Sequence, residues 1–312
     1  MENMATRDAY GQALAELGQA HADVMVLDAD LSGSTKTSTF AKKFPNRFFN
    51  LGVAEQNMIG WAAGLAATGK VPFASTFAVF ATGRAFDQLR NSVAYPALNV
   101  KIAATHAGLS VGPDGGSHQA IEDIALARIL PNFTVVVPAD GPQAAEATRA
   151  AYAQRGPVYL RLGRPKVQTV TQGHPFVLGK AQMLRTGSDA TIIACGTLVQ
   201  EALSAADSLA KENISLRVLN VHTIKPLDEN AILAAARETG AVLSAEEHTI
   251  LGGLGSAVAE LFAEAGLGVP FKRLGVRDQF GESGEPGELF KKHGLDAASL
   301  AAAVRELLKK KK

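Results

Sequence analysis

The sequence has one cysteine, no long apolar run and almost no net charge, and each of these absences excludes a class of protein. Cys195 is the only cysteine in 312 residues, so neither an internal disulfide nor a two-cysteine metal motif can form. No stretch approaches the roughly 18 apolar residues that a membrane-spanning helix requires. The formal net charge is +1 and no basic stripe is interleaved with aromatic residues, which argues against a nucleic-acid partner.

The N-terminus also lacks the apolar core of a secretion signal, and this favours a cytoplasmic location. Apolar residues make up 47% of the chain and charged residues 20%, which is typical of a globular protein with a sizeable core. Cys195 lies in an apolar run and is expected in that core. With 312 residues the chain exceeds a typical single domain, so two domains are expected.

Helical and strand patterns alternate along the chain, which predicts an α/β protein with two domains, each a mainly parallel sheet flanked by helices. Strands are expected at 24–27, 71–75, 101–105, 134–137, 158–162, 191–194, 216–221, 241–245 and 271–276. Helices are expected at 5–19, 55–67, 80–94, 119–129, 142–153, 198–211, 228–238, 256–265 and 297–308. A stretch rich in Pro, Gly, Gln and Thr indicates a linker at 166–182 between domains at 1–165 and 183–312.

Two glycine-rich segments interrupt this pattern. Residues 106–117 are expected to form a loop. The run Leu-Gly-Gly-Leu-Gly at 251–255 opens a predicted helix but lacks the full Gly-x-Gly-x-x-Gly spacing of a dinucleotide phosphate turn. The spacing therefore favours a tight helix-entry turn over a nucleotide site.

Glu55 is the most informative single residue because it is an acid in an apolar segment. No Lys or Arg lies between Arg47 and Lys70. Burying an ionised acid without a partner is costly, so such a glutamate is expected to favour its protonated form and to bond something specific. The alternative is a half-exposed glutamate at a helix start, where the positive end of the helix dipole stabilises it.

Four ordered motifs resemble the transketolase family. They are Asp-Ala-Asp-Leu-Ser-Gly-Ser at 28–34, Leu-Gly-Val-Ala-Glu-Gln-Asn-Met at 51–58, Ser-Thr-Phe-Ala-Val-Phe at 75–80, and the loop from His-Ala-Gly at 106–108 to Gly-Pro-Asp-Gly-Gly-Ser-His-Gln at 112–119. The match covers the pyrimidine-binding and C-terminal domains of that family. Full-length members also have a domain in which a Gly-Asp-Gly stretch binds the cofactor's diphosphate through a metal. Since no Gly-Asp-Gly occurs here, the resemblance implies the C-terminal subunit of a split transketolase.

The resemblance implies thiamine diphosphate as the cofactor, with a divalent metal, expected to be Mg, bound by the partner subunit and no metal ligands in this chain. Glu55 would bond a ring nitrogen of the aminopyrimidine and favour its reactive tautomer. Asp30 and Leu31 would touch the cofactor near the subunit contact.

An aromatic pocket for the pyrimidine is implied by Phe77 and Phe80, which would share one face if a helix begins there. Plain core packing is the alternative for this pair. Full-length enzymes often have another aromatic residue one turn further on, where this chain has Gly83. The pocket is therefore expected to be less enclosed.

For the sugar, the resemblance implies a channel lined by His106, Asp114 and His118. An imidazole can exchange protons with a sugar oxygen near neutral pH, so both histidines are candidate catalytic residues together with Glu55. Asp114 would accept a hydrogen bond from a sugar hydroxyl.

The terminal phosphate of the sugar would be held by Arg7, Ser34 and Arg164. Guanidinium groups pair with phosphate oxygens through two parallel hydrogen bonds, and serine adds a neutral donor. Arg161 lies on the same strand as Arg164 and makes that assignment less secure.

Together these implications predict a transketolase of the pentose phosphate pathway, active only with an N-terminal partner subunit in a two-plus-two heterotetramer. It would move a two-carbon glycolaldehyde unit from a ketose phosphate to an aldose phosphate. The alternatives are a beta subunit of a 2-oxoacid dehydrogenase, a deoxyxylulose phosphate synthase, and a non-catalytic regulatory subunit. His106 and the phosphate-binding set favour sugar phosphates, and a non-catalytic subunit is expected to lose Glu55 or the histidines, which are present.

Overall fold

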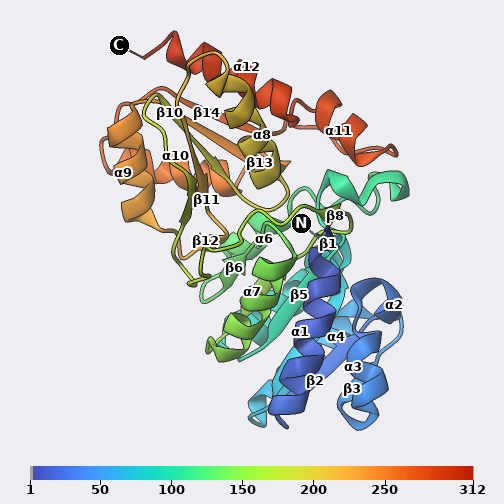
Figure 1. Cartoon of the computed structure of the whole chain (residues 1–312). Coiled ribbons are helices and arrows are strands. Elements are labelled where there is room, and N and C mark those ends of the chain that lie inside the picture. Colours follow the sequence, from blue (N-terminus) through green and yellow to red (C-terminus); the bar gives the residue numbers. More distant parts are fainter. Residues whose placement is uncertain (1–2, 312) are drawn as a thin grey trace.

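The computed structural model describes residues 3–311 and has two main sheets with helices packed on their faces (Figure 1). The first sheet has seven strands in the order β12-β6-β7-β5-β4-β2-β3, and all are parallel except β12. The strands are β2 (Val24–Asp28), β3 (Phe48–Asn50), β4 (Val71–Phe77), β5 (Lys101–Thr105), β6 (Thr134–Val136), β7 (Val158–Arg161) and β12 (Thr223–Lys225). No helix among the described residues is long and apolar enough to cross a bilayer.

The second sheet has five strands in the order β14-β13-β10-β11-β9, with only β9 antiparallel. The strands are β9 (Gln182–Arg185), β10 (Ala190–Ala194), β11 (Leu216–Asn220), β13 (Val242–Thr249) and β14 (Phe271–Val276). Its helices are α8 (Leu198–Ala210), α9 (Glu229–Thr239), α10 (Leu254–Glu264), α11 (Pro286–Lys292) and α12 (Ala297–Leu308). The predicted fold class, two mainly parallel sheets flanked by helices, is confirmed.

The helices around the first sheet differ from the prediction at 80–94 and 119–129, and the short helices α2 (Ser32–Thr35) and α3 (Ser38–Lys43) were not predicted. The other helices are α1 (Thr6–Ala20), α4 (Glu55–Ala67), α5 (Phe86–Gln88), α6 (Asp123–Ile129) and α7 (Gly141–Ala153), with 3-10 turns at Pro45–Arg47 and Leu109–Asp114. The predicted helix 80–94 is broken into a π-turn at Phe80–Arg84, α5 and a second π-turn at Leu89–Ala94, since Ala85 leaves helical geometry.

The helix predicted at 119–129 begins only at Asp123, and the predicted loop 106–117 contains the 3-10 turn Leu109–Asp114. The cause is a contact between the two segments. Ala120 forms a β-bridge with Ala107, and its carbonyl accepts the N–H of Gly108 at 2.8 Å. A residue that pairs in this way cannot also belong to the first turn of a helix.

The predicted linker at 166–182 is tied to both sheets. Its first residues form β8 (Lys166–Val167), which pairs antiparallel with β1 (Met4–Ala5), and its last residue begins β9. β12 comes from the second half of the chain but does not join the second sheet. It pairs antiparallel with β6 of the first sheet. The domain limits at 165 and 183 therefore stay a prediction.

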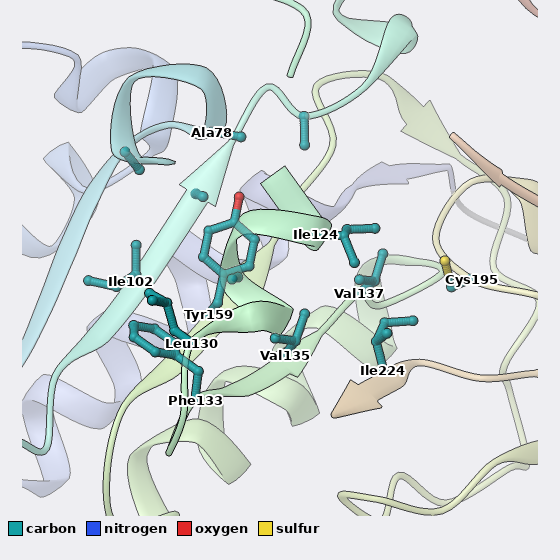
Figure 2. Packing of buried hydrophobic residues seen from close by; sticks show 14 of the residues in the cluster. Ala78, Ile102, Ile124, Leu130, Phe133, Val135, Val137, Tyr159, Cys195 and Ile224 are labelled. Carbon is teal, nitrogen blue, oxygen red and sulfur yellow. The ribbon is translucent and has the colours of Figure 1, made fainter. Parts of the chain in front are cut away.

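One apolar core continues from the first sheet into the second. Val135, Val137 and Ile124 of the first unit lie beside Ile224 and Cys195 from the second half of the chain (Figure 2). Cys195 is 2% exposed, and burial raises the pKa of its thiol. The cysteine is therefore a core residue, as the sequence indicates.

The parallel strands of the first sheet direct their carboxyl ends to a single edge, where ligands bind in open α/β sheets. Strands β2, β3, β4, β5 and β7 end at that edge. The loops that follow them carry almost all of the candidate residues.

Candidate active site

The predicted site residues gather at the carboxyl edge of the first sheet because each follows one of its parallel strands. Asp30, Leu31 and Ser34 follow β2, and Glu55 follows β3. Phe77 is the last residue of β4, and Phe80 follows this strand. His106, Asp114 and His118 follow β5, and Arg164 follows β7. Arg7 is the exception: it lies in the first turn of α1 and reaches the others through hydrogen bonds.

Glu55 is the first residue of α4 and is only 4% exposed. Its Oε1 accepts a hydrogen bond from Arg84 Nη1 at 3.0 Å. The prediction that this buried acid bonds something specific is confirmed, and the partner is the base Arg84. The alternative is right that Glu55 begins a helix but wrong that the acid is half-exposed. The partner lies 29 residues further along the chain, beyond the apolar segment that surrounds Glu55.

Arg84 is a candidate site residue that the sequence analysis missed, although the sequence carries a signal for it. It is the only charged residue between Lys70 and Asp87. A single cation in an apolar run needs an acid partner for the same reason that Glu55 needs a base. Pairing the two isolated charges would have found this contact.

Four rings form an aromatic group beside this ion pair. Phe77 and Phe80 stack with their centroids 5.6 Å apart and their planes at 12°. The His106 ring stacks on Phe77 at 3.7 Å, and the His118 ring meets Phe80 edge-on at 5.3 Å. The two phenylalanines do not share a helix face as expected. Phe77 ends a strand and Phe80 begins the π-turn, and this bend brings their rings together.

The contacts of Arg84 test whether a flat nitrogen heterocycle fits here. The guanidinium carbon lies 3.9 Å from the centroid of Phe80, while the same group donates to Glu55. A planar group thus already bonds the carboxylate and covers an aromatic face, which are the two contacts that an aminopyrimidine requires. Because the Arg84 side chain is 49% exposed, it can turn towards solvent and yield this place.

His106 is held as a neutral imidazole with its proton on Nδ1. Arg7 Nη1 lies 3.0 Å from His106 Nε2, and an arginine can only donate, so Nε2 accepts. Nδ1 then carries the proton and donates to Thr105 Oγ1 at 2.9 Å. Burial, followed by the charges of Arg7 and Arg164, lowers the pKa of His106 to about 3. The imidazole is therefore neutral in this fold, and the proton exchange with a sugar oxygen that the sequence analysis expects of His106 stays a prediction.

Two of the three residues predicted to bind phosphate, Arg7 and Arg164, line a cavity of about 350 Å³, whereas Ser34 does not line it and contacts Arg7 only through its backbone oxygen. Arg7 Nη1 donates to the carbonyl oxygen of Ser34 at 3.1 Å, and Arg164 Nη1 donates to Asp114 Oδ1 at 2.9 Å. The cavity is lined by Arg7, Ser110, Val111, Pro113, Arg164, Pro165, Glu285 and Pro286. Burial lowers the pKa of Arg7, whose Nε is buried without a hydrogen-bond partner among the described residues. Two guanidinium groups at one cavity can bind an anion.

Arg161 is not available for the same task. Its guanidinium is buried and pairs with the Asp123 carboxylate at 2.8 and 3.1 Å. It also donates to the backbone oxygens of Ala120 and Glu247. Its Nε and Nη2 donors are thus engaged inside the protein and the side chain is only 6% exposed, which favours Arg164 as the candidate on this part of the chain.

The loop after β2 is fixed by two further polar residues that the sequence analysis did not select. Asp28 is fully buried, and its carboxylate accepts from the N–H of Leu31 at 2.6 Å and from two threonine hydroxyls. Burial raises the pKa of Asp28. The side chain of Asn50 bonds both the backbone N–H and the carboxylate of Asp30, which has a φ of +65°. Strand ends β2 and β3 are joined in this way.

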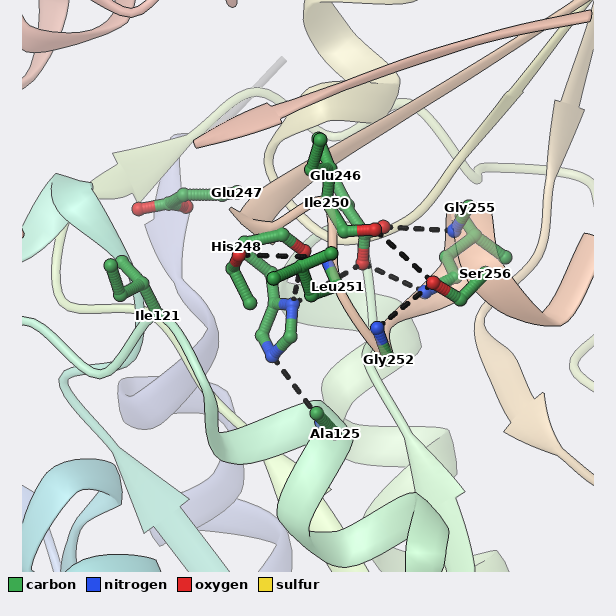
Figure 3. Close-up of polar contacts among 12 residues, drawn as sticks. Ile121, Ala125, Glu246, Glu247, His248, Ile250, Leu251, Gly252, Gly255 and Ser256 are labelled. Carbon is green, nitrogen blue, oxygen red and sulfur yellow. Dashed lines mark hydrogen bonds and ion pairs between the residues drawn. The ribbon is translucent and has the colours of Figure 1, made fainter. Parts of the chain in front are cut away.

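The glycine-rich run at 251–255 forms a helix-entry turn, as predicted. The Glu246 carboxylate accepts the N–H groups of Leu254 and Gly255, each at 2.8 Å, at the start of α10 (Figure 3). A Cβ atom on Gly253 would lie 2.1 Å from Glu246 Oε2. An internal carboxylate therefore occupies the helix N-terminus that a phosphate would need.

Comparison with protein families gives two matches that together cover most of the chain. The family model described as "Transketolase, pyrimidine binding domain" matches residues 2–169. The model described as "Transketolase, C-terminal domain" matches residues 179–300.

Similar proteins fall into half-length and full-length groups. The "Putative transketolase C-terminal section" of Methanocaldococcus jannaschii is 50% identical over 97% of this chain and 96% of its own length. The "6-deoxy-6-sulfo-D-fructose transketolase subunit SqwH" of a Clostridium species is 45% identical over 98% and 95%. Human transketolase is 41% identical over 99% of this chain, which spans only 50% of the human protein.

A solved structure described as "Split gene transketolase, inactive beta4 tetramer" is 54% identical to this chain. It superposes with a TM-score of 0.92 and covers 99% of this chain and 100% of the solved chain. Both the sequence and the fold of this chain are therefore similar to one half of a divided protein.

Proposed function

The chain belongs to the transketolase family, and from that premise we propose that it is one subunit of a split, thiamine diphosphate-dependent transketolase. With its partner it transfers a two-carbon glycolaldehyde unit from a ketose phosphate to an aldose phosphate. The observation that carries this proposal is the buried Glu55 at the carboxyl edge, next to the stacked pair Phe77 and Phe80. This cytoplasmic enzyme would act in the pentose phosphate pathway.

Thiamine diphosphate, when bound, supplies the electron sink that carbon–carbon bond cleavage requires. In this chain Glu55 holds the ring nitrogen of the aminopyrimidine, and Phe77 and Phe80 cover the ring face. The Arg84 side chain turns outward to make room. We assign the diphosphate and its divalent metal, expected to be Mg²⁺, to the partner subunit.

The sugar lies beside the loop that follows β5. The neutral imidazole of His106 and the carboxylate of Asp114 orient its hydroxyl groups by hydrogen bonding. His118, whose ring is next to Phe80, would exchange protons with the sugar oxygen together with His106. Arg7 and Arg164 bind the anionic tail in the cavity between them.

A partner subunit is supported by the exposed surface around Glu55. Val53 is 71% exposed, and Trp61 on α4 is 48% exposed. On the same helix, a Cβ atom added to Gly60 or Gly64 would meet no other atom within 4 Å, so a second backbone can approach closely. We propose that the diphosphate-binding subunit covers this face in a two-plus-two heterotetramer. The relative that is 54% identical is described as an inactive tetramer of one kind of chain, which supports partner dependence.

A sulfonated ketose is the second candidate substrate. The relative that is 45% identical is named for a 6-deoxy-6-sulfo sugar. In this chain Arg164 is already paired with Asp114, and Glu285 also lines the cavity. The two cations of the wall are thus offset by one acid in the wall and one paired with Arg164, which suits an anion of one charge as well as a phosphate of nearly two.

The test is a transfer assay with the chain alone, the diphosphate-binding subunit alone, and the two together. Each sample receives thiamine diphosphate, Mg²⁺, xylulose 5-phosphate and ribose 5-phosphate, and a parallel series uses a sulfonated ketose. The proposal expects seven-carbon and three-carbon products only from the pair. Full turnover by the chain alone would overturn the split-subunit assignment. A pair that associates but shows no cofactor-dependent transfer would indicate a non-catalytic subunit.

A further inference from the structure

The carboxylate of Glu247 crosses from the second unit to the candidate substrate loop of the first. Glu247 lies on β13 and is 4% exposed. Its Oε1 accepts a short hydrogen bond from the backbone N–H of Ser110, and its Oε2 accepts the hydroxyl of Thr197 at 2.7 Å. The acid therefore links the loop after β5 to the loop after β10.

The loop backbone sits directly against this acid. Gly108 has a φ of +78°, and a Cβ atom there would lie 2.4 Å from the Glu247 carboxylate. Only glycine allows both the backbone conformation and the close approach. The backbone oxygen of Glu247 is also fixed, because it accepts a hydrogen bond from the buried guanidinium of Arg161 at 2.9 Å.

Ser110 is the second residue of the 3-10 turn Leu109–Asp114, and the first N–H groups of such a turn have no partner within it. Glu247 supplies that partner, as a capping side chain does at a helix start. The capped turn has His106 three residues before it and Asp114 at its end. A shift of this turn would move both groups relative to Phe77.

We propose that Glu247 is a positioning residue: by capping the turn Leu109–Asp114, it sets where His106 and Asp114 meet the sugar. This inference rests on the proposed function for its kinetic consequence, but not for the loop order itself. It gives the second unit a defined part in the site, in addition to Glu285 and Pro286 at the cavity wall. Burying a carboxylate whose hydrogen-bond donors are all neutral costs free energy of folding. The contact with the loop gives this acid a role that explains why it is buried there.

The neighbouring acid Glu246 provides a matched control. It is also buried, at 1% exposure, and lies on the same strand, but its carboxylate points the other way and caps α10 (Figure 3). Substituting Glu246 therefore affects the start of α10 and leaves the Ser110 contact in place.

The experiment compares the parent with Glu247→Ala, Glu247→Gln and the control Glu246→Gln. Hydrogen exchange of residues 107–115 is measured on the chain alone, where it reports the cap directly. Transfer kinetics and the dissociation constant for thiamine diphosphate are measured on the pair, at a temperature well below unfolding. Glutamine preserves the shape, and its amide oxygen can still accept from Ser110.

We expect exchange at 107–115 to rise about tenfold or more in Glu247→Ala, and kcat/KM for the sugars to fall by a similar factor. Cofactor affinity should stay within about twofold, because Glu55 and Phe80 follow other strands. Glu247→Gln should regain most of both losses, and Glu246→Gln should match the parent. Unchanged exchange at 107–115 in Glu247→Ala would overturn the proposal, as would faster exchange with unchanged kinetics. If the parent pair transfers nothing, the proposed function fails while the exchange data still decide whether Glu247 holds the loop.

Discussion

At the residue scale, Glu55 and His106 are both buried, and each is bonded to one arginine. Arg84 is the ionic partner of the buried Glu55, and Arg7 fixes the tautomer of His106. In both pairs the arginine is the more exposed partner and the functional group is the buried one. The two buried groups are thus positioned by arginine side chains that are partly accessible to solvent.

Replacing Glu55 with alanine should remove activity while the fold survives. The reconstituted pair is expected to lose turnover by about 100-fold or more, the range for losing a proton-handling group. The stability of the chain should change by about 1 kcal/mol or less, since the half-exposed Arg84 can be hydrated once the acid is gone. Chemical unfolding and turnover are measured side by side.

The matched control is Glu16→Ala, which removes an acid from an exposed pair with Arg149. It should leave both activity and stability near the parent values. Near-normal turnover in Glu55→Ala would take Glu55 out of its assigned role.

Protonation of His106 should destabilise the chain in mild acid. Its pKa is about 3 in the fold, compared with 6.5 when it is free, so the unfolded chain binds the extra proton first as the pH falls. The stability that neutral His106 contributes is full above about pH 6.5 and is lost progressively towards pH 3. The parent should therefore lose about 1 kcal/mol more than His106→Asn between pH 7 and pH 5.5.

Urea unfolding of both proteins at the two pH values gives this difference. His222, whose pKa is lowered to about 4 by burial, contributes the same trend to both proteins and cancels. Equal losses in parent and variant would show that His106 is not buried in its neutral form.

At the element scale, regular periodic segments could be predicted from the sequence, and elements that depend on distant partners could not. The alternation of strands and helices gave the fold class because each buried strand and each amphipathic helix carries its own period. The helix predicted at 80–94 is interrupted in the structure, and the strand β12 was not predicted. The first is interrupted where Ala85 leaves helical geometry, and the second exists only because β6 lies beside it.

The candidate site followed the same division. Most of its residues could be selected because they stand in ordered motifs, whereas most of their mutual bonds could not. The pairing of Asp114 with Arg164 spans 50 residues, and that of Arg7 with His106 spans 99. Sequence spacing carries no signal for such contacts without a structure.

The exchange of β12 between the halves predicts that residues 1–182 do not fold alone. Without β12, strand β6 becomes an unpaired edge, and the shared core loses Ile224 and Cys195. The fragment is expected to aggregate or to lack a cooperative thermal transition by circular dichroism. Adding residues 183–312 as a second chain during refolding should restore the transition. A fragment 1–182 that melts cooperatively near the parent temperature would contradict the account.

At the scale of the whole molecule, the carboxyl edge is closed on one side by the second unit and open on the other. Glu247 and the turn before α11 support the substrate loop, while α4 presents Trp61 and two bare glycines to solvent. The proposed partner subunit would cover α4 and so complete this edge.

Trp61, the only tryptophan in the chain, should report that covering directly. Its side chain is 48% exposed beside Phe49, so docking of the partner should shift its emission to shorter wavelength. The spectrum of the pair is compared with the sum of the two separate spectra. The same comparison is made with Trp61→Phe, and its difference spectrum is subtracted to remove any change in the partner's own fluorescence. An emission that stays unchanged while the subunits demonstrably associate would place the interface elsewhere.

The most direct measurement of the central claim is a calorimetric titration of thiamine diphosphate, in the presence of Mg²⁺, into the chain, its diphosphate-binding partner, and the two combined. The account predicts tight, saturable binding of one cofactor per pair and binding at least about tenfold weaker to either chain alone, because each supplies only one end of the site. Equally tight binding to the isolated chain, or none to the associated pair, would contradict it.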